Sequence, residues 1–314
     1  MTANENTEKP RLWAIAMTFY YSTHCNTMKN LLITLCFLLG VSYSGLIFAG
    51  DRNPFFALCM DTHDEKKRTI DEQNELLKEL GYDGVAHLWL PGLEERVASA
   101  KKHDIEVFQI YFDVNLAADP PFDPKLAEVL PCLKGSKTQL AVLINGATPS
   151  DATQDDRVVQ ILQKILEIAD PLGVKVVLYP HVNAWNEKIS DCVRIAKRFP
   201  DKKIGVMFNL CHWAAIDKSE NLDSVLELAK PYLAAVSING TDTPEELQAK
   251  TGNWLQPLDT GSYDTAVVLK ALDKVGYRGP IGLQCYGQPG DARLHLERSM
   301  KKWNELGRLP PKSL

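Results

Sequence analysis

Side chains that could transfer protons follow a series of short apolar runs along this chain. Imidazole is the side chain that ordinarily changes protonation near neutral pH, so histidines at such positions are the first candidates for proton transfer. His63, His87, His181 and His212 are four of the seven histidines, and each stands in or just after an apolar run. A lone histidine is usually a structural residue, but several at strand ends favour a shared site. We identify His181 and His212 as the candidate catalytic acid and base.

Amide, hydroxyl and aromatic side chains occupy other positions in or just after the apolar runs. Amide and hydroxyl groups bind sugar hydroxyls, and a flat ring packs against the apolar face of a sugar. The side chains expected to bind substrate are Asp61, His87, Tyr111, Asn145, Tyr179, Asn183, Asn209, Ser237, Asn239, Trp254 and Gln284. Trp89, Trp185 and Trp213 also stand at or beyond strand ends, where packing within the fold explains each of them equally well.

The elements that position these residues are short apolar strands alternating with amphipathic helices. Such alternation is typical of a parallel sheet covered by helices. The predicted strands are residues 55–60, 84–90, 107–112, 140–144, 175–178, 204–208, 234–238 and 280–284. This number favours a single closed (β/α)8 TIM barrel over an open doubly wound sheet, and no Gly-x-Gly-x-x-Gly turn follows the first strand. In such barrels the chemistry lies at the carboxyl ends of the strands.

The sequence also indicates helix boundaries and one long connection between predicted elements. In residues 151–170 the apolar side chains recur every three or four positions. Thr69 and Glu72 have the spacing of a capping box, and that helix is expected to stop at Gly81. Residues 239–263 form the longest gap between predicted elements, contain Trp254, and are interpreted as a lid over the barrel mouth.

The first 49 residues do not share this pattern. Residues 31–49 carry no charge, follow Lys29 and end at the small residue Ala49, which is the layout of a secretory signal peptide. We expect an upstream extension (1–27), a cleavable signal peptide (28–49) and a mature barrel (50–314). The protein is then periplasmic or secreted and makes no membrane contact. An uncleaved segment would instead anchor it, since its length approaches that of a membrane span.

Charge and cysteine content exclude several classes. The chain has 35 Lys and Arg against 40 Asp and Glu, a net charge of −5, and no basic cluster. Proteins that bind nucleic acid gain much of their affinity by neutralising phosphates, so we expect no nucleic-acid partner. The seven cysteines include no Cys-x-x-Cys pair, which argues against a zinc ribbon.

The order of the motifs resembles the xylose isomerase-like TIM barrels, a family that contains sugar isomerases and epimerases, inosose dehydratases and the endonuclease IV nucleases. The resemblance extends over residues 53–306 and implies a TIM barrel that acts on a small sugar or sugar phosphate. It is carried by Tyr179-Pro-His-Val-Asn183, Asn209-Leu-Cys-His212-Trp213, Pro257-Leu-Asp-Thr-Gly-Ser-Tyr-Asp264 and Gly276-Tyr-Arg-Gly-Pro-Ile-Gly-Leu-Gln284.

The departures from the family pattern concern its metal site. The resemblance implies a divalent metal held by Glu, Asp, His and Glu at the ends of the last four strands, with the two Glu also moving the proton. The matching positions here are Tyr179, Asn209, Ser237 and Gln284. Neutral ligands seldom replace the hydration of a divalent cation, so we expect no metal and no other cofactor. A zinc site built from His63, His87, His181 and His212 is the remaining arrangement.

Two functions therefore stay open. The first is a sugar or sugar phosphate isomerase or epimerase that acts through His181 and His212 without the standard metal. The second is an extracytoplasmic barrel that binds a carbohydrate without converting it, because the side chains present bond and stack well but are poor bases. An abasic-site nuclease, the third alternative, is disfavoured by the acidic charge balance.

Overall fold

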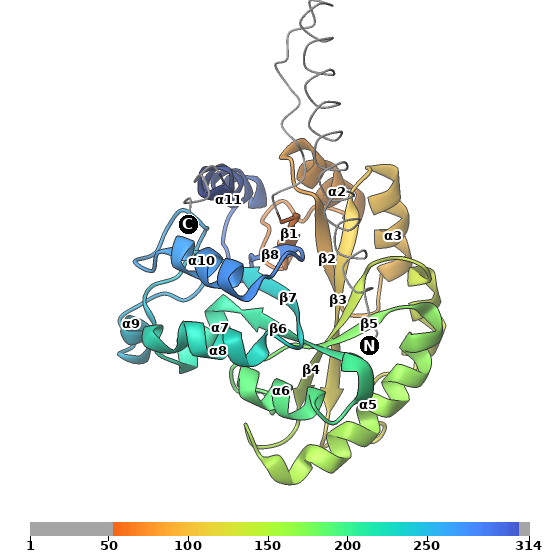
Figure 1. Ribbon diagram of the computed structural model, residues 1–314. Coiled ribbons are helices and arrows are strands. Elements are labelled where there is room, and N and C mark those ends of the chain that lie inside the picture. Colours follow the sequence, from red (N-terminus) through yellow and green to blue (C-terminus); the bar gives the residue numbers. More distant parts are fainter. Residues whose placement is uncertain (1–52, 308–314) are drawn as a thin grey trace, which may run out of the picture. The chain divides into compact units, whose positions relative to one another are not determined.

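Eight parallel strands close into a barrel in which each strand pairs with its neighbour in the chain and β8 pairs with β1 (Figure 1). The computed structural model describes residues 53–307, so the predicted extension and signal peptide lie outside the described residues. The strands are β1 (Phe55–Leu58), β2 (Gly84–Leu88), β3 (Glu106–Asn115), β4 (Gln139–Asn145), β5 (Lys175–Leu178), β6 (Ile204–Asn209), β7 (Leu233–Ile238) and β8 (Ile281–Gln284). The predicted (β/α)8 TIM barrel is confirmed.

Helices cover the outside of the barrel, as the amphipathic stretches predict (Figure 1). They are α2 (Ile70–Glu79), α3 (Leu93–Lys102), α4 (Leu126–Val129), α5 (Asp155–Ala169), α6 (Ile189–Ala196), α7 (Leu210–Ile216), α8 (Leu222–Ala229), α9 (Pro244–Gln248), α10 (Thr265–Val275) and α11 (Ala292–Gly307). The capping box at the start of α2 is confirmed, since Thr69 accepts from the amide of Glu72 and Glu72 accepts from the amide of Thr69. Among the helices of residues 53–307, none has the length and hydropathy needed to cross a membrane.

Backbone conformation sets where the first two strands stop. Predicted strand 55–60 ends two residues early because Cys59 adopts a left-handed conformation, with φ of 58°. Predicted strand 84–90 likewise ends before Trp89, whose φ is 67°. At the opposite end of β2, a Cβ on Gly84 would lie 2.1 Å from the carbonyl oxygen of Glu106, so only glycine permits the close approach of β3.

Two apolar layers result from the alternation of side chains along the strands. The outer layer lies between the strands and the helices. The inner layer fills the barrel and includes Phe56, Tyr111, Tyr179 and Met207. Two residues of the inner layer, Tyr111 and Tyr179, are tyrosines. Their hydroxyls add hydrogen-bonding groups to the apolar interior at the carboxyl end of the barrel.

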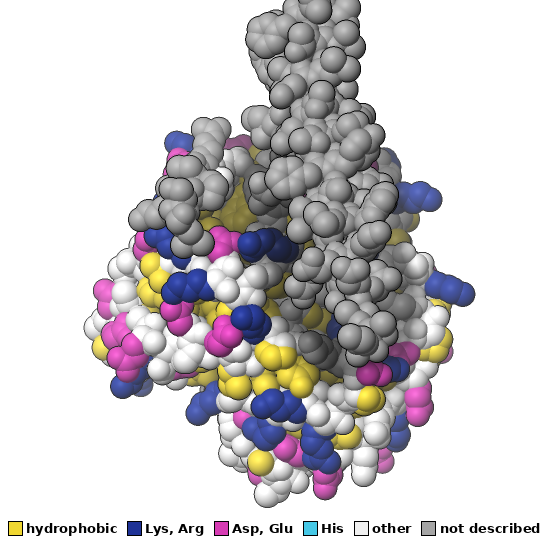
Figure 2. Space-filling view, viewed as in Figure 1, with side chains coloured by type: hydrophobic (Ala, Val, Ile, Leu, Met, Phe, Trp, Pro, Cys, Tyr) yellow, Lys and Arg dark blue, Asp and Glu magenta, His cyan; other side chains and the backbone are white. Residues whose placement is uncertain are grey.

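The described surface seen in Figure 2 mixes both signs of charge. Basic and acidic side chains alternate there, with apolar groups between them. Exposed ion pairs of the described chain include Lys274 with Asp223 and Arg198 with Asp156, at 2.7 Å in both cases. This part of the surface thus has no extended basic stripe of the kind that tracks a phosphate backbone.

Candidate functional site

Tyr179, Asn209 and His212 meet at the carboxyl ends of β5 and β6. The hydroxyl of Tyr179 lies 2.9 Å from Nε2 of His212, and Nδ2 of Asn209 donates to the same hydroxyl at 3.2 Å. Asn209 is also the N-cap of α7, because its Oδ1 accepts from the backbone amide of His212 at 3.4 Å. One amide side chain therefore both starts the helix that carries His212 and holds the hydroxyl that His212 contacts.

His181 completes the group, which we call the histidine centre: Tyr179, His181, Asn209 and His212. The ring centroids of His181 and His212 are 3.8 Å apart with their planes tilted by 43°. Nδ1 of His181 lies 2.8 Å from the carbonyl oxygen of Val182, so this nitrogen carries the proton. Nε2 of His181 is then left with its lone pair available.

Burial keeps the histidine centre uncharged near neutral pH. Desolvation lowers the pKa of His181 below its ordinary value. It lowers the pKa of the more deeply buried His212 further, and repulsion from His181 adds to the effect. Burial raises the pKa of Tyr179, so its hydroxyl stays protonated.

The hydrogen bonds of Tyr179 fix the tautomer of His212. The side chain of Gln284 bonds to the hydroxyl of Tyr179, while its own Oε1 accepts from the amide of Tyr286 at 3.1 Å. Because Nδ2 of Asn209 donates to the hydroxyl oxygen, we assign the hydroxyl proton to the contact with Nε2 of His212. His212 therefore holds its proton on Nδ1, and this buried nitrogen has no partner among residues 53–307.

Two further buried polar atoms lie at the end of β7. Oγ of Ser237 and Oδ1 of Asn239 have no hydrogen-bond partner in the described part of the chain. Ser237 pairs in register with Asn209 across β6 and β7. Nδ2 of Asn239 donates to the carbonyl of Trp254 at 2.8 Å, and the Trp254 ring stands edge-on to His212 with centroids 5.6 Å apart. The predicted lid segment thus delivers its tryptophan to the histidine centre.

Comparison with known proteins identifies the family. Residues 75–305 match the model of the xylose isomerase-like TIM barrel. The chain belongs to this family. No curated protein matches the sequence significantly.

Solved structures similar to this xylose isomerase-like TIM barrel include sugar epimerases and a probable dehydratase. The 3-keto-D-glucoside 4-epimerase of E. coli has a TM-score of 0.62 and 15% identity, over 81% of this chain and 100% of that one. The D-psicose 3-epimerase of Clostridium cellulolyticum H10 has a TM-score of 0.60 and 14% identity, over 81% and 98%. The probable 3-DHS dehydratase of Bacillus anthracis has a TM-score of 0.63 and 15% identity, over 80% and 98%. At these identities the similarity establishes the fold alone.

Tyr111 and Asn145 lie on the β3 and β4 side of this family barrel. The Tyr111 ring packs edge-on against Tyr179 with centroids 5.0 Å apart, and its hydroxyl donates to Oε1 of Gln109 at 2.9 Å. Asn145 donates to Oδ1 of Asp113 at 2.6 Å. The structure therefore brings Tyr111 to the histidine centre and places Asn145 in a second polar pair at the neighbouring strand ends.

Three predicted site residues lie elsewhere. His87 is bonded to the carbonyl of Pro91 at 2.9 Å and receives a 3.5 Å contact from Arg96 of α3, so its ring packs on the helical side of β2. Asp61 and Asn183 are exposed in the loops after β1 and β5. The sheet and loop conformations thus separate these three side chains from the histidine centre.

Sequence inspection missed Asn186, a fully buried residue in the loop after β5. Its Oδ1 accepts from the amide of Ile144 at 3.0 Å, and its Nδ2 donates to the carbonyl of Tyr179 at 2.9 Å. Asn186 thus ties the end of β4 to the backbone of Tyr179. The sequence signal was a second asparagine, three residues after Asn183 in the same short loop.

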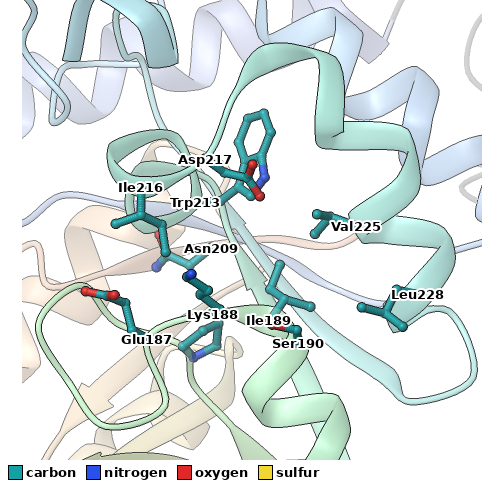
Figure 3. A pocket seen from close by; sticks show the side chains of 11 residues that line it. Glu187, Lys188, Ile189, Ser190, Asn209, Trp213, Ile216, Asp217, Val225 and Leu228 are labelled. Atoms are coloured by element: carbon teal, nitrogen blue, oxygen red, sulfur yellow. The ribbon is translucent and has the colours of Figure 1, made fainter. Parts of the chain in front are cut away.

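Two hollows adjoin the strand ends. One, of about 400 Å³, lies at the ends of β2 and β3, where the 43% exposed ring of Trp89 faces the loop that contains Phe122. The other, of about 150 Å³, lies between the start of α6 and helices α7 and α8 (Figure 3). Asn209 lines this second hollow as well as the histidine centre.

Proposed function

We propose that the chain is a sugar or sugar phosphate isomerase or epimerase that moves a proton between carbon atoms through His181 and His212. The observation that carries this proposal is the pairing of two neutral imidazoles with complementary free atoms. His181 offers a lone pair on Nε2, and His212 offers a proton on Nδ1. Their ring centroids lie 3.8 Å apart, close enough to act on one small ligand.

In the proposed reaction, Nε2 of His181 removes the proton from a carbon atom next to a carbonyl group. The C–H electron pair moves into the new C=C bond of an enediolate, whose oxygen takes the negative charge. The N–H of His212 donates a hydrogen bond to that oxygen, and the hydrogen bond from Tyr179 holds the imidazole in position. His181 returns the proton to the adjacent carbon while the hydroxyl proton passes to the other enediolate oxygen, which gives the isomer. To give the epimer, the enediolate must turn over in the site so that His181 returns the proton to its opposite face.

We further propose that no divalent cation of the family type takes part. The hydroxyl of Tyr179 stays protonated, and Oδ1 of Asn209 already accepts from Sγ of Cys211 at 2.9 Å and from the amide of His212. A hard cation prefers several anionic oxygens, which this donor set does not offer. One equivalent of Mn²⁺, Mg²⁺ or Zn²⁺ in the purified protein would contradict this proposal.

The carbohydrate part of the proposal is supported by the groups around the histidine centre. Ser237 and Asn239 present buried oxygens that lack protein partners, and sugar hydroxyls are suited to satisfy them. Trp254 supplies an aromatic ring next to His212. The exposed ring of Trp89 adds a second aromatic surface at the strand ends.

A non-catalytic carbohydrate-binding barrel is the second candidate. In the described structure no carboxylate is hydrogen-bonded to either imidazole of the centre, and their pKa values are lowered. Each histidine is thus a weak base, which suits binding better than proton abstraction.

Deuterium exchange distinguishes the two candidates. The protein is incubated with a panel of aldoses, ketoses, their phosphates and inositols in D₂O, and deuterium entry at carbon is followed by NMR. We expect entry into one ligand, abolished in His181→Asn but not in His63→Asn, whose ring is exposed and packs on Tyr286. Binding of a sugar without exchange would establish the second candidate.

For the N-terminal region we propose export through residues 28–49, which precede the described structure. The support is the uncharged stretch that follows Lys29. The mass of the mature protein, purified from cells that secrete it, is expected to correspond to a chain that starts near Gly50.

A further inference from the structure

The hollow at the carboxyl ends of β2 and β3, which we call the Trp89 pocket, is the larger of the two hollows described above. Its volume of about 400 Å³ lies within the range of pockets that hold small organic ligands, about 300–1,000 Å³. It is lined by residues 89–91 after β2, by the end of β3 and by the loop that follows β3. The Trp89 pocket is therefore large enough for a ligand of the size of a sugar ring.

Trp89 lines this pocket in a conformation that a bulky residue rarely adopts. Its φ is 67°, in the left-handed region, and its backbone amide donates to the carbonyl of Tyr111 at 3.1 Å. The ring is exposed, whereas tryptophan is mostly buried in folded proteins. Strained backbone of this kind is concentrated at sites that bind ligands. Both observations indicate that the indole is positioned for a ligand rather than for packing in the core.

The loop after β3 is held in place by contacts of its own. Phe122 pairs with Val114 in an antiparallel bridge, and its ring packs on Phe112 with centroids 5.9 Å apart. The amide of Asn115 donates to the carbonyl of Pro121 at 2.8 Å. Two further prolines of this loop also line the pocket and restrict its backbone. A wall that is ordered before binding loses little entropy when a ligand arrives, which favours affinity.

The polar side chains of the Trp89 pocket suit the hydroxyl groups of a sugar. Oδ1 of Asp113 accepts from Nδ2 of Asn145 at 2.6 Å, and Oδ1 of Asp123 accepts from the amide of Lys125 at 2.9 Å. Within residues 53–307 the second oxygen of each carboxylate stays available. None of the described residues that line the pocket is basic. Sugar hydroxyls can donate to these carboxylates, whereas a phosphate group would be repelled by them.

Asp113 connects the Trp89 pocket with the inner face of the barrel. Phe112 and Val114 pack in the outer layer, so Asp113 points to the inside, as Tyr111 does. Two residues of a strand span about 6.5 Å, and Asp113 stands one such step beyond Tyr111. The Tyr111 ring in turn contacts Tyr179 of the histidine centre. Asp113 thus lies where a second ring would follow a first ring that is bound at the histidine centre.

We propose that the substrate is an uncharged glycoside of two sugar rings. The ring that reacts lies at the histidine centre, and the second ring packs on the indole of Trp89 while its hydroxyls donate to Asp113 and Asp123. This inference rests on the proposed function, because it extends the sugar on which His181 and His212 act. The Trp89 pocket then determines which sugars are accepted.

The test measures binding to the full-length protein by isothermal titration calorimetry. The probes are maltose, cellobiose, lactose and sucrose, and the comparison ligands are their component monosaccharides glucose, galactose and fructose. We expect one disaccharide to bind about 10-fold more tightly than its component monosaccharides, because packing on the indole and hydrogen bonds to carboxylates add to the affinity. This advantage should disappear in Trp89→Ala, and most of it should remain in Trp89→Phe, which keeps a flat ring.

Asp113→Asn and Asp119→Asn form a matched pair, because both residues belong to β3 or the loop after it but only Asp113 of the two lines the pocket. Asp113→Asn should lower the affinity for the disaccharide several-fold, since a charged acceptor is lost, and Asp119→Asn should leave it unchanged.

The proposal is overturned if no disaccharide binds more tightly than its monosaccharides, if the advantage persists in Trp89→Ala, or if the two aspartate variants bind the disaccharide equally well. A failure of the proposed function would instead appear as a lack of deuterium exchange, which leaves these affinities unaffected.

Discussion

Replacing Tyr179 by phenylalanine tests the hydrogen bonds of the histidine centre. The ring is kept and only the hydroxyl is lost, so packing against Tyr111 changes little. Nε2 of His212 and Nδ2 of Asn209 both lose their partner on this hydroxyl. Leaving a buried polar group unsatisfied costs about 1–3 kcal/mol, so we expect the free energy of unfolding to fall by about 2 kcal/mol or more.

Tyr111→Phe is the matched control. The hydroxyl of Tyr111 is as buried as that of Tyr179, but in the described structure its one nitrogen or oxygen partner is Oε1 of Gln109. Urea unfolding gives the stability of both variants, and ¹⁵N NMR of labelled histidine gives the tautomer of His212. Tyr179→Phe should lose more stability and shift His212 away from the Nδ1–H tautomer, whereas Tyr111→Phe should leave that tautomer unchanged. An unchanged His212 spectrum in Tyr179→Phe would refute the assignment of its proton to Nδ1.

Three further outcomes are expected. Because burial lowers the pKa of His181, kcat/KM for exchange should be flat near neutral pH and fall only below about pH 6.5, as the base becomes protonated; a profile still rising above pH 8 would exclude His181 as the base. Burial lowers the pKa of His295 to about 4, so the unfolded chain binds more protons between pH 4 and 6.5 and stability falls with acidification in this window. Chemical unfolding at pH 7 and pH 5 should differ by about 2 kcal/mol more in the native protein than in His295→Leu; equal differences would contradict this. Trp89→Ala should lower the affinity for the sugar several-fold in a titration followed by tryptophan fluorescence. The melting temperature should stay unchanged, because the ring is 43% exposed. Unaltered affinity would show that Trp89 is not part of the site.

The barrel could be predicted because its strands are apolar on both faces and its helices are amphipathic. Residues 175–178 were predicted as a strand with the limits that the structure gives. The predicted ends of the first two strands were wrong because of backbone conformation. The residue types of Cys59 and Trp89 do not indicate their positive φ. Such conformations depend on the tertiary packing of the loops.

The site could be predicted only in part, because a one-residue change of register reverses the side of a strand on which a side chain lies. Along β2, Val85 packs in the outer layer and Ala86 in the inner one, so by the same alternation His87 packs toward α3. Asn209 and His212 were easier to relate, since an asparagine three residues before a histidine fits an N-cap at a helix start. The Tyr179–His212 contact joins the end of β5 to helix α7 and has no local signal.

Solvent exchange after removal of metal tests the account most directly. The protein is treated with a strong chelator, its metal content is measured, and deuterium entry into the active sugar of the panel is followed in D₂O. Exchange should continue at an unchanged rate and depend on the histidines at 181 and 212. Exchange that stops with the chelator and returns with Mn²⁺ would contradict an uncharged, metal-independent centre.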